Sequence, residues 1–227
     1  MSLKTFYNKY PYPNIQDSYP HGIENYSSIN SPKNFDGSIF VIGCGTAEAV
    51  IISLENPLAE IYAIDISATS LDICANLQDQ FGLKNLTLDE RDITTFVPQK
   101  QFDIAVSSCV LHHIPEVDKA VLNIYNSLTD TGSLQGCVYS TNRPKYLRDI
   151  ANMGFKSIAE LRVYLESNPN EWYTNHIKND EELADAFLNP HWIDYDFDLL
   201  TELFSQFKER NFVLDNDKIH FQCIKDT

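Results

Sequence analysis

Positive charge is scarce in this sequence. Its 227 residues include 17 lysines and arginines against 32 aspartates and glutamates, which gives a formal net charge of −15. Binding to DNA or RNA needs clustered basic residues that displace counterions from phosphates, and the sequence has no such cluster. The composition therefore argues against a nucleic-acid substrate. We interpret the acidity as a solvated surface, and a field that attracts a cationic substrate is the alternative.

Long apolar runs are also missing. No stretch has the roughly eighteen consecutive apolar residues of a membrane span, and no apolar segment with a small-residue cleavage site opens the chain. The five cysteines lack metal-ligand spacing, and their places in predicted strands or helices are typical of reduced core thiols. We expect a cytoplasmic protein without a membrane span or a bound metal. The cysteines are Cys44, Cys74, Cys109, Cys137 and Cys223.

The hydrophobic pattern predicts one α/β domain. With 43% hydrophobic residues, the chain can bury a single large core. Apolar runs alternate with helical patterns, which implies a parallel sheet. Only Asn216-Asp-Lys separates the last two runs, too few residues for a parallel crossover, so these runs must form a hairpin. The predicted strands are 38–42, 61–64, 85–88, 103–107, 134–139, 212–215 and 219–224, and the predicted helices of this core are 47–55, 68–80, 117–128 and 197–209.

The first predicted strand runs into a glycine turn. Residues 39–47 read Ile-Phe-Val-Ile-Gly-Cys-Gly-Thr-Ala, and Asp65 ends the next strand. The glycines at 43 and 45 permit a tight turn and let a ligand approach the backbone, while the following helix offers free N–H groups. A carboxylate at the tip of the second strand can hold a ribose diol. Together these features predict a nucleotide pocket.

A dinucleotide fits this turn poorly. Its fingerprint requires a third glycine where this chain has Glu48, whose carboxylate would repel a pyrophosphate. Further along, the chain reads Leu88-Asp-Glu-Arg-Asp92-Ile and then Phe102-Asp-Ile-Ala-Val-Ser-Ser-Cys-Val-Leu-His-His-Ile-Pro115. With the glycine turn and Ala-Ile-Asp-Ile-Ser, these motifs resemble those of the class I S-adenosylmethionine-dependent methyltransferases over about residues 37–140. The N-terminal Tyr10-Pro-Tyr-Pro13 is similar to that of a bacterial group within this family that has no assigned substrate.

The resemblance implies a Rossmann-like, seven-stranded, mostly parallel sheet with an antiparallel last strand, S-adenosyl-L-methionine as cofactor and S-adenosyl-L-homocysteine as product. Two departures stand out: Val41 replaces the usual acid before the first glycine, and Ala47 replaces the third glycine. Glu48 either supplies a carboxylate instead or is an acid favoured by the helix N-terminus. The cofactor-binding residues that we expect are Gly43, Cys44 and Gly45 at the methionine and ribose, Asp65 at the ribose hydroxyls, Ile66, Asp92 and Ile93 at the adenine, Ser108 at the methionine amino group, and Tyr12.

Two segments fall outside the predicted core. Residues 1–35 contain five tyrosines and four prolines, and we expect them to form a lid with little regular structure. Residues 141–195 contain both tryptophans, with predicted helices at 144–151, 157–166 and 180–187. Ligands of Rossmann-like sheets bind at the carboxyl ends of the strands, so this insertion should cap the site. We therefore divide the chain into a lid at 1–35 and a single methyltransferase domain at 36–227.

The implied chemistry is an in-line displacement on a sulfonium. The protein mainly holds the nucleophile in line with the methyl group and excludes water, and an imidazole can assist as a base near neutral pH. The histidine pair after the fourth strand supplies the first candidates, although one histidine can equally form the pocket wall. Arg143 either holds a carboxylate or enters a helix facing solvent. The candidate catalytic residues are His113, His112 and Tyr139, and the candidate substrate residues are Tyr10, His21, Arg143 and Trp192.

We expect a small-molecule substrate, because the surface is acidic and two aromatic segments cover the site. The alternatives are methyl transfer to a peptide or protein side chain, and a catalytically silent partner subunit that binds the cofactor or nothing. A nicotinamide oxidoreductase is more distant, because Glu48 does not suit it and no separate catalytic domain follows. The sequence leaves the acceptor atom and the oligomeric state open.

Overall fold

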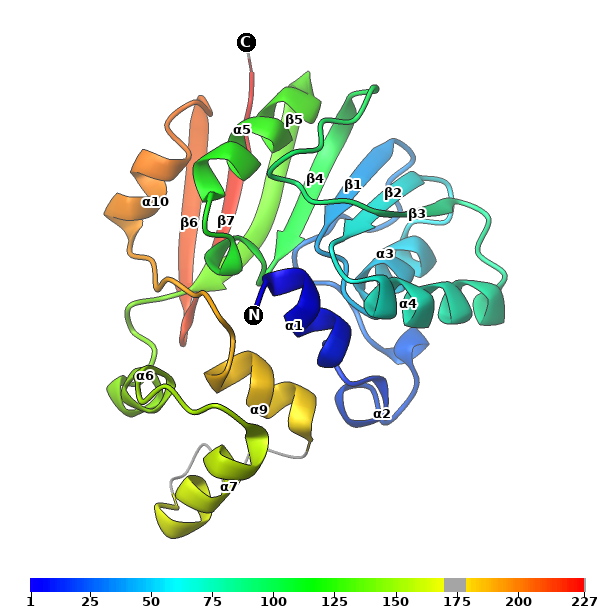
Figure 1. Cartoon of the computed structure of the whole chain (residues 1–227). Helices are drawn as coiled ribbons and strands as arrows, with labels where there is room; N and C mark the ends of the chain where they lie inside the picture. Colours follow the sequence, from blue (N-terminus) through cyan, green and yellow to red (C-terminus); the bar gives the residue numbers. More distant parts are fainter. Residues whose placement is uncertain (170–178, 227) are drawn as a thin grey trace.

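The computed structural model describes residues 1–169 and 179–226 and contains one seven-stranded sheet (Figure 1). The strand order is β3-β2-β1-β4-β5-β7-β6, in which β7 runs antiparallel to both of its neighbours. This confirms the predicted Rossmann-like sheet with one reversed strand. The strands are β1 (Ser38–Ile42), β2 (Glu60–Asp65), β3 (Leu86–Glu90), β4 (Phe102–Ser108), β5 (Leu128–Tyr139), β6 (Glu209–Asp215) and β7 (Lys218–Ile224).

The boundaries of two elements differ most from the prediction. Strand β5 begins at Leu128, directly after helix α5 (Val117–Ser127), because Leu128 already pairs with Phe102 of β4, ahead of a register shift that leads to the pairing of Ser133 with Ile104. The predicted helix 197–209 ends at Leu203, since the chain turns so that Phe204 and Phe207 pack into the core before β6 begins. Apolar periodicity alone did not separate this turn from the helix.

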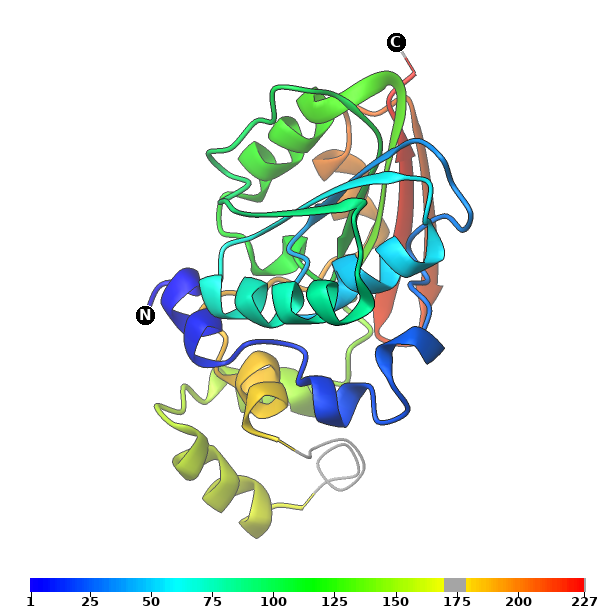
Figure 2. The same ribbon diagram turned by 90° about the vertical axis from the view of Figure 1, so that its right-hand side faces the viewer.

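Helices cover both faces of the sheet (Figures 1 and 2). Alternate residues of β1 point to opposite sides: Phe40 and Ile42 join one core, whereas Ile39 and Val41 join the other. The first core packs against α5 (Val117–Ser127) and α10 (Phe197–Leu203), and the second against α3 (Glu48–Glu55) and α4 (Ala68–Phe81). A strand with both faces buried reads as a continuous apolar run, which is why β1 was visible in the sequence.

A third core lies beyond the carboxyl ends of the parallel strands (Figure 1). It joins the N-terminal segment (residues 1–35) to the cap segment (residues 141–195), whose residues 170–178 lie outside the described ranges. Phe6 of α1 (Leu3–Lys9) is fully buried there. The other helices of this core are α6 (Lys145–Asn152), α7 (Ile158–Ser167) and α9 (Asp180–Phe187).

The N-terminal segment contains more regular structure than we expected. Helix α1 is capped by Ser2, α2 (Ile15–Ser18) is capped by Asn14, and the short helix η1 (Ile23–Asn25) follows. The prolines fall outside these helices, so they interrupt the segment without preventing local helix formation. No helix in the two described ranges combines the length and apolar character that a membrane crossing needs.

Candidate functional site

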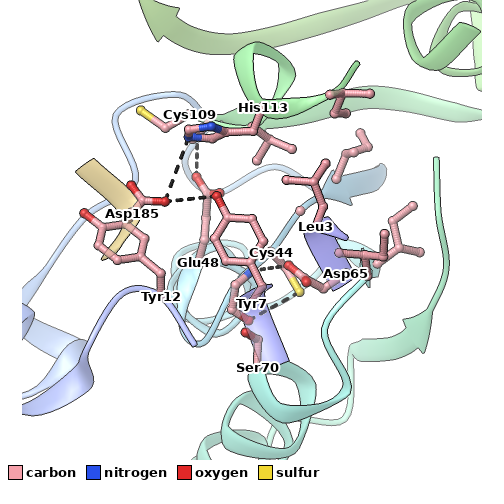
Figure 3. Close-up of a pocket in the computed structure, with 18 of the residues that line it drawn as sticks. Leu3, Tyr7, Tyr12, Cys44, Glu48, Asp65, Ser70, Cys109, His113 and Asp185 are labelled. Carbon is pink, nitrogen blue, oxygen red and sulfur yellow. Dashed lines mark hydrogen bonds and ion pairs between the residues drawn. The ribbon is translucent and has the colours of Figure 1, made fainter. Parts of the chain in front are cut away.

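A cavity of about 1110 Å³ lies between the carboxyl ends of the strands and the layer formed by the N-terminal and cap segments (Figure 3). One end of its wall carries the glycine turn after β1, and the other carries side chains of the helix η2 (Leu111–His113) and of α9. The sequence-predicted residues that line it are Tyr12, Gly43, Cys44, Gly45, Asp65, Ile66, Asp92, Ile93, Ser108, His113 and Tyr139.

The glycine turn is held by the N-terminal segment. Gly43 and Gly45 have φ angles of 68° and 54°, in the left-handed region that favours glycine. The backbone N–H of Thr46 donates to the carbonyl of Tyr12 at 3.2 Å, and its hydroxyl donates to the carbonyl of Pro13 at 2.7 Å. A Cβ at Gly45 would lie 2.5 Å from the Tyr12 oxygen. The turn therefore needs glycine partly to let this segment dock.

Asp65 joins the turn to the second strand. Its two carboxylate oxygens accept hydrogen bonds of 2.8 Å, one from the backbone N–H of Gly45 and one from that of Ser67. Burial raises the pKa of this carboxyl, while the backbone donors oppose the shift. Each oxygen of a carboxylate can accept a second hydrogen bond, so Asp65 keeps acceptor capacity for a diol in the cavity.

The adenine end that we expected lies after β3. Asp92 is exposed, and its Oδ1 accepts from the backbone N–H and the hydroxyl of Thr94 at 2.9 and 2.7 Å. Ile93 is buried, and Ile66 lies half-buried beyond Asp65. Among the described residues, no hydrogen bond engages Oδ2 of Asp92, which leaves that oxygen for a donor in the cavity.

Val41 and Ala47 are the two positions that depart from the family's usual motif. Among the carboxylates that line the cavity, that of Glu48 lies closest to them in the sequence. Val41 is fully buried against α3 and does not line the cavity, whereas Glu48 does. The hydroxyl of Ser108 donates to Oε1 of Glu48 at 2.5 Å, and the Asn30 amide donates to the Ser108 hydroxyl at 2.9 Å. Burial raises the pKa of Glu48 to about 7, although the hydrogen bond from Ser108 acts against the shift.

Glu48→Gln should change how the stability of the ligand-free protein depends on pH. A carboxyl whose pKa is raised from 4.5 to about 7 in the folded state favours folding at low pH, and this contribution is lost progressively as the pH rises from about 4.5 to about 7. Glutamine cannot ionise, so at pH 8 the variant should be more stable than the wild type by about 3 kcal/mol, which thermal unfolding measures. Glu60→Gln, an exposed change, is the control. Parallel pH profiles for the wild type and Glu48→Gln would contradict the assignment.

His113 and Asp185 face each other at the other end of the cavity (Figure 3). Nε2 of His113 lies 3.9 Å from Oδ1 of Asp185, and both side chains are buried. Asp185 Oδ1 also accepts from the hydroxyl of Tyr7 at 2.9 Å, and that hydroxyl accepts from the Asn189 amide at 2.8 Å. Helix α1, the cap segment and η2 thus meet at one carboxylate.

The hydrogen bond at Nδ1 determines the tautomer of His113. Nδ1 lies 2.9 Å from the carbonyl oxygen of His191, and a carbonyl only accepts, so Nδ1 carries the proton. Burial lowers the pKa of His113, against the opposing charge of Asp185. Neutral His113 therefore presents the lone pair of Nε2 toward the cavity, as a general base requires.

His112 lies behind Tyr139, which itself lines the cavity. The His112 ring is fully buried and lies 4.0 Å from the Tyr139 ring, and it does not line the cavity. Burial lowers its pKa well below the ordinary value. The structure therefore places His113, and not its neighbour, where a base can reach an acceptor.

The four candidate substrate residues lie outside the cavity wall. Tyr10 packs against Phe6 in the third core, and His21 is exposed. Arg143 is buried, donates to the carbonyl of Ala186 and stacks between the rings of Tyr139 and Trp192. Arg143 and Trp192 thus brace the cap behind Tyr139. This placement does not favour direct substrate contact by any of the four.

Sequence reasoning missed Asp185 and Tyr7. Asp185 lies in the run Leu183-Ala-Asp-Ala-Phe187, all of it buried. An acid enclosed by apolar residues on a short helix is a signal of a buried polar role, because charged side chains are almost never fully buried without a partner. Tyr7 carried no such signal, since its partner lies 178 positions away in the sequence.

Comparisons with known proteins bear on the family and the fold of this chain. The model of a family described as a methyltransferase domain matches residues 38–188. An uncharacterised protein of Synechococcus sp. is 25% identical, over 88% of this chain and 56% of its own length. An uncharacterised protein of Haemophilus influenzae is 24% identical, over 54% of this chain and 49% of its own. The chain thus spans about half the length of the curated relatives that it matches.

Solved structures share the fold at low identity. Phosphoethanolamine N-methyltransferase 2 of Haemonchus contortus, in complex with phosphomonomethylethanolamine and S-adenosylhomocysteine, is similar with a TM-score of 0.65 and 12% identity, covering 100% of this chain and 61% of that one. PKMT2 of Rickettsia typhi, in complex with S-adenosylhomocysteine, is similar with a TM-score of 0.63 and 16% identity, covering 91% and 44%. These structures support the fold of the chain.

Proposed function

The chain belongs to the methyltransferase domain family, and from this premise we propose that it transfers the methyl group of S-adenosylmethionine to a small-molecule acceptor. One observation carries the proposal. A single cavity joins the glycine turn and Asp65, at one end, to His113 and Asp185 at the other. A nucleotide-binding end and a proton-accepting end in one continuous space suit a cofactor and an acceptor bound side by side.

The polar groups of the cavity match those of S-adenosylmethionine. Asp65 has free acceptor capacity for the ribose diol, and Oδ2 of Asp92 for the adenine amine. Ile66 and Ile93 offer apolar surface for the adenine ring. Glu48 suits the ammonium of the methionine part, and a bound ammonium would favour its ionised form. In this assignment Glu48 takes the place of the acid that is missing at Val41.

A small acceptor is favoured because chain segments cover the cavity. Tyr7 of α1 reaches Asp185 of α9, and Asn14 donates to Glu181 at 3.3 Å, so the N-terminal and cap segments are tied together above the site. Asn8 accepts from the hydroxyl of Ser67 at 3.0 Å, which ties α1 to the start of α4. We assign the N-terminal segment as a lid that excludes water from the reacting groups.

The residues around the acceptor then need to do little chemistry. When bound, S-adenosylmethionine supplies a methyl group that is already activated on a sulfonium. Nε2 of His113 accepts the proton that the acceptor loses, and Asp185 stabilises the resulting imidazolium at 3.9 Å. Tyr139 and the lid hold the acceptor in line. No covalent intermediate on the protein is required.

Ligand-induced stabilisation tests the cofactor. S-adenosylhomocysteine at a hundred times its Kd should stabilise the native state by about 2.7 kcal/mol, whereas NAD should have no effect. Thermal unfolding with each ligand measures this difference. A shift with NAD but not with S-adenosylhomocysteine would overturn the proposal. Methyl transfer itself is then followed by the release of S-adenosylhomocysteine across a panel of small acceptors.

A further inference from the structure

At the end of the cavity where we place the methyl acceptor, which we call the acceptor end, the side chains of His113 and Asp185 face each other. Both offer only hydrogen-bond acceptor atoms at this point. Neutral His113, protonated at Nδ1, has only a lone pair at Nε2, and this atom lies 3.9 Å from Oδ1 of Asp185. Two acceptors cannot bond to each other, and the carboxylate cannot donate while it is ionised. A donor with at least two hydrogens, placed beside both atoms, satisfies both of them.

Asp185 also lacks a cationic partner. Among the described residues, its carboxylate has a hydrogen bond only with Tyr7 and an ion-pair contact only with His113. The lysine and arginine side chains of the cavity wall are engaged elsewhere: Lys4 pairs with Glu90, Arg91 pairs with Asp89, and Lys218 lies against the thiol of Cys109. A buried carboxylate without a counter-charge is costly, so a cation supplied by the ligand would be strongly favoured.

Tyrosine rings surround this carboxylate. Tyr7, Tyr12 and Tyr139 all line the cavity (Figure 3 labels the first two). The hydroxyl of Tyr7 lies 2.9 Å from the carboxylate, and after burial the charge of Asp185 is the next cause that raises the pKa of Tyr7 and of Tyr139. Aromatic faces attract cations and repel anions, so the walls favour the same charge as the carboxylate does.

We propose that the acceptor is a protonated primary or secondary amine, whose nitrogen binds between the carboxylate of Asp185 and Nε2 of His113. This inference rests on the proposed methyl transfer and names its substrate class. An ammonium supplies the missing charge and an N–H for each acceptor. A neutral hydroxyl has one hydrogen, so it would leave either Asp185 or His113 unpaired, and a carboxylate ligand would be repelled by Asp185.

The same two residues prepare the nitrogen for reaction. An ammonium has no lone pair, so one proton must leave before attack, and Nε2 of His113 receives it. The freed lone pair forms the new N–C bond while the C–S bond breaks, and its electron pair stays on the sulfur. Asp185 meanwhile keeps an N–H of the acceptor and faces the new imidazolium. Charge near Asp185 is therefore conserved during the proton transfer.

Matched ligands on the S-adenosylhomocysteine complex test this assignment. Thermal unfolding is measured with benzylamine, benzyl alcohol and benzoate, then with N-methyl-, N,N-dimethyl- and N,N,N-trimethylbenzylammonium, and with ethanolamine and ethylene glycol as a smaller pair. We expect each primary amine to raise the melting temperature more than its alcohol, benzoate to have no effect, and the effect to weaken at the tertiary and quaternary amines, which have too few N–H groups. Asp185→Asn should remove the preference for amines, with at least a tenfold loss of amine affinity.

Two variants separate this role from a structural one. Asp180→Asn makes the same change on the exposed first turn of α9 and should keep the amine preference. Tyr7→Phe removes the hydrogen bond between the lid and Asp185 but keeps the carboxylate and the aromatic ring, so the affinity for every ligand should fall while amines stay preferred over alcohols. Stabilisation by alcohols or benzoate above that by amines, no amine effect at all, or an unchanged preference in Asp185→Asn would overturn the assignment.

The proposed function fails by a different result. If S-adenosylhomocysteine itself does not stabilise the protein, methyl transfer is contradicted, and the amine panel is then read on the ligand-free protein. A normal response to S-adenosylhomocysteine without any amine preference contradicts the substrate class alone.

Discussion

Asp65→Ala should abolish the stabilisation of the protein by S-adenosylhomocysteine. The carboxylate is positioned by the backbone N–H groups of Gly45 and Ser67, and its remaining lone pairs are the acceptors that we assign to the ribose diol. Hydrogen bonds to a charged group contribute roughly 1.5–3 kcal/mol each, so losing two should weaken binding at least a hundredfold. Isothermal titration calorimetry measures the affinity directly.

The control must separate binding from folding, because Asp65 also holds the glycine turn. Asp79→Ala, an exposed change on α4, should leave the affinity unchanged. Asp65→Asn preserves the side-chain volume, but its amide NH₂ must face one of the two backbone donors, so binding should again be lost. If either Asp65 variant folds and binds S-adenosylhomocysteine with wild-type affinity, the ribose assignment is wrong.

The sheet could be predicted because its signals, apolar runs and short connections, are local and recur along the chain. The strands buried on both faces read as apolar runs, and the short link between β6 and β7 left no choice but a hairpin, in which Asn216 adopts a φ of 55°. The meeting of the glycine turn with Asp65 was predictable for a related reason. A glycine turn and a strand-end acid lie at fixed places along the chain, so their meeting follows from the parallel sheet.

The acceptor end of the cavity, with His113 and Asp185, could not be predicted from the sequence in this way. It is built where α1, η2 and α9 meet, and these elements are far apart in the sequence. The two neighbouring histidines illustrate the limit. In a short helix with three residues per turn, adjacent side chains point in very different directions, so one ring enters the cavity and the other lies behind Tyr139. Only the tertiary structure tells them apart.

The acid that the family usually carries at position 41 is missing in this chain, and Glu48 brings a carboxylate to the cavity from another position. A carboxylate at position 41 would be buried in the apolar core against α3 in this chain, since Val41 is fully buried there. Glu48 instead reaches the cavity from the first turn of α3, where it accepts a hydrogen bond from Ser108, whose hydroxyl in turn accepts from Asn30. The sequence offered Glu48 as one of two interpretations, and its hydrogen bonds and place in the wall favour the carboxylate role.

His113→Asn should separate catalysis from binding. The asparagine amide can still donate to the carbonyl of His191, as Nδ1 does, but nothing replaces the lone pair of Nε2. Loss of a general base typically costs 10²- to 10⁴-fold, so kcat should fall by about this factor while the affinity for S-adenosylhomocysteine stays unchanged. Rates of S-adenosylhomocysteine release, with calorimetry on the same samples, measure both quantities.

The pH dependence distinguishes a base from a residue that only packs. Because burial lowers the pKa of His113, the wild-type rate should persist below pH 6.5 and fall only as the buried imidazole becomes protonated. The acidic limb set by His113 should be missing in His113→Asn, and His21→Gln, an exposed change, should retain it. If His113→Asn keeps the full rate, Nε2 is not the base, and the proton must leave the acceptor by another route. If the rate falls but the acidic limb remains, His113 positions the acceptor and a different group sets the pH dependence.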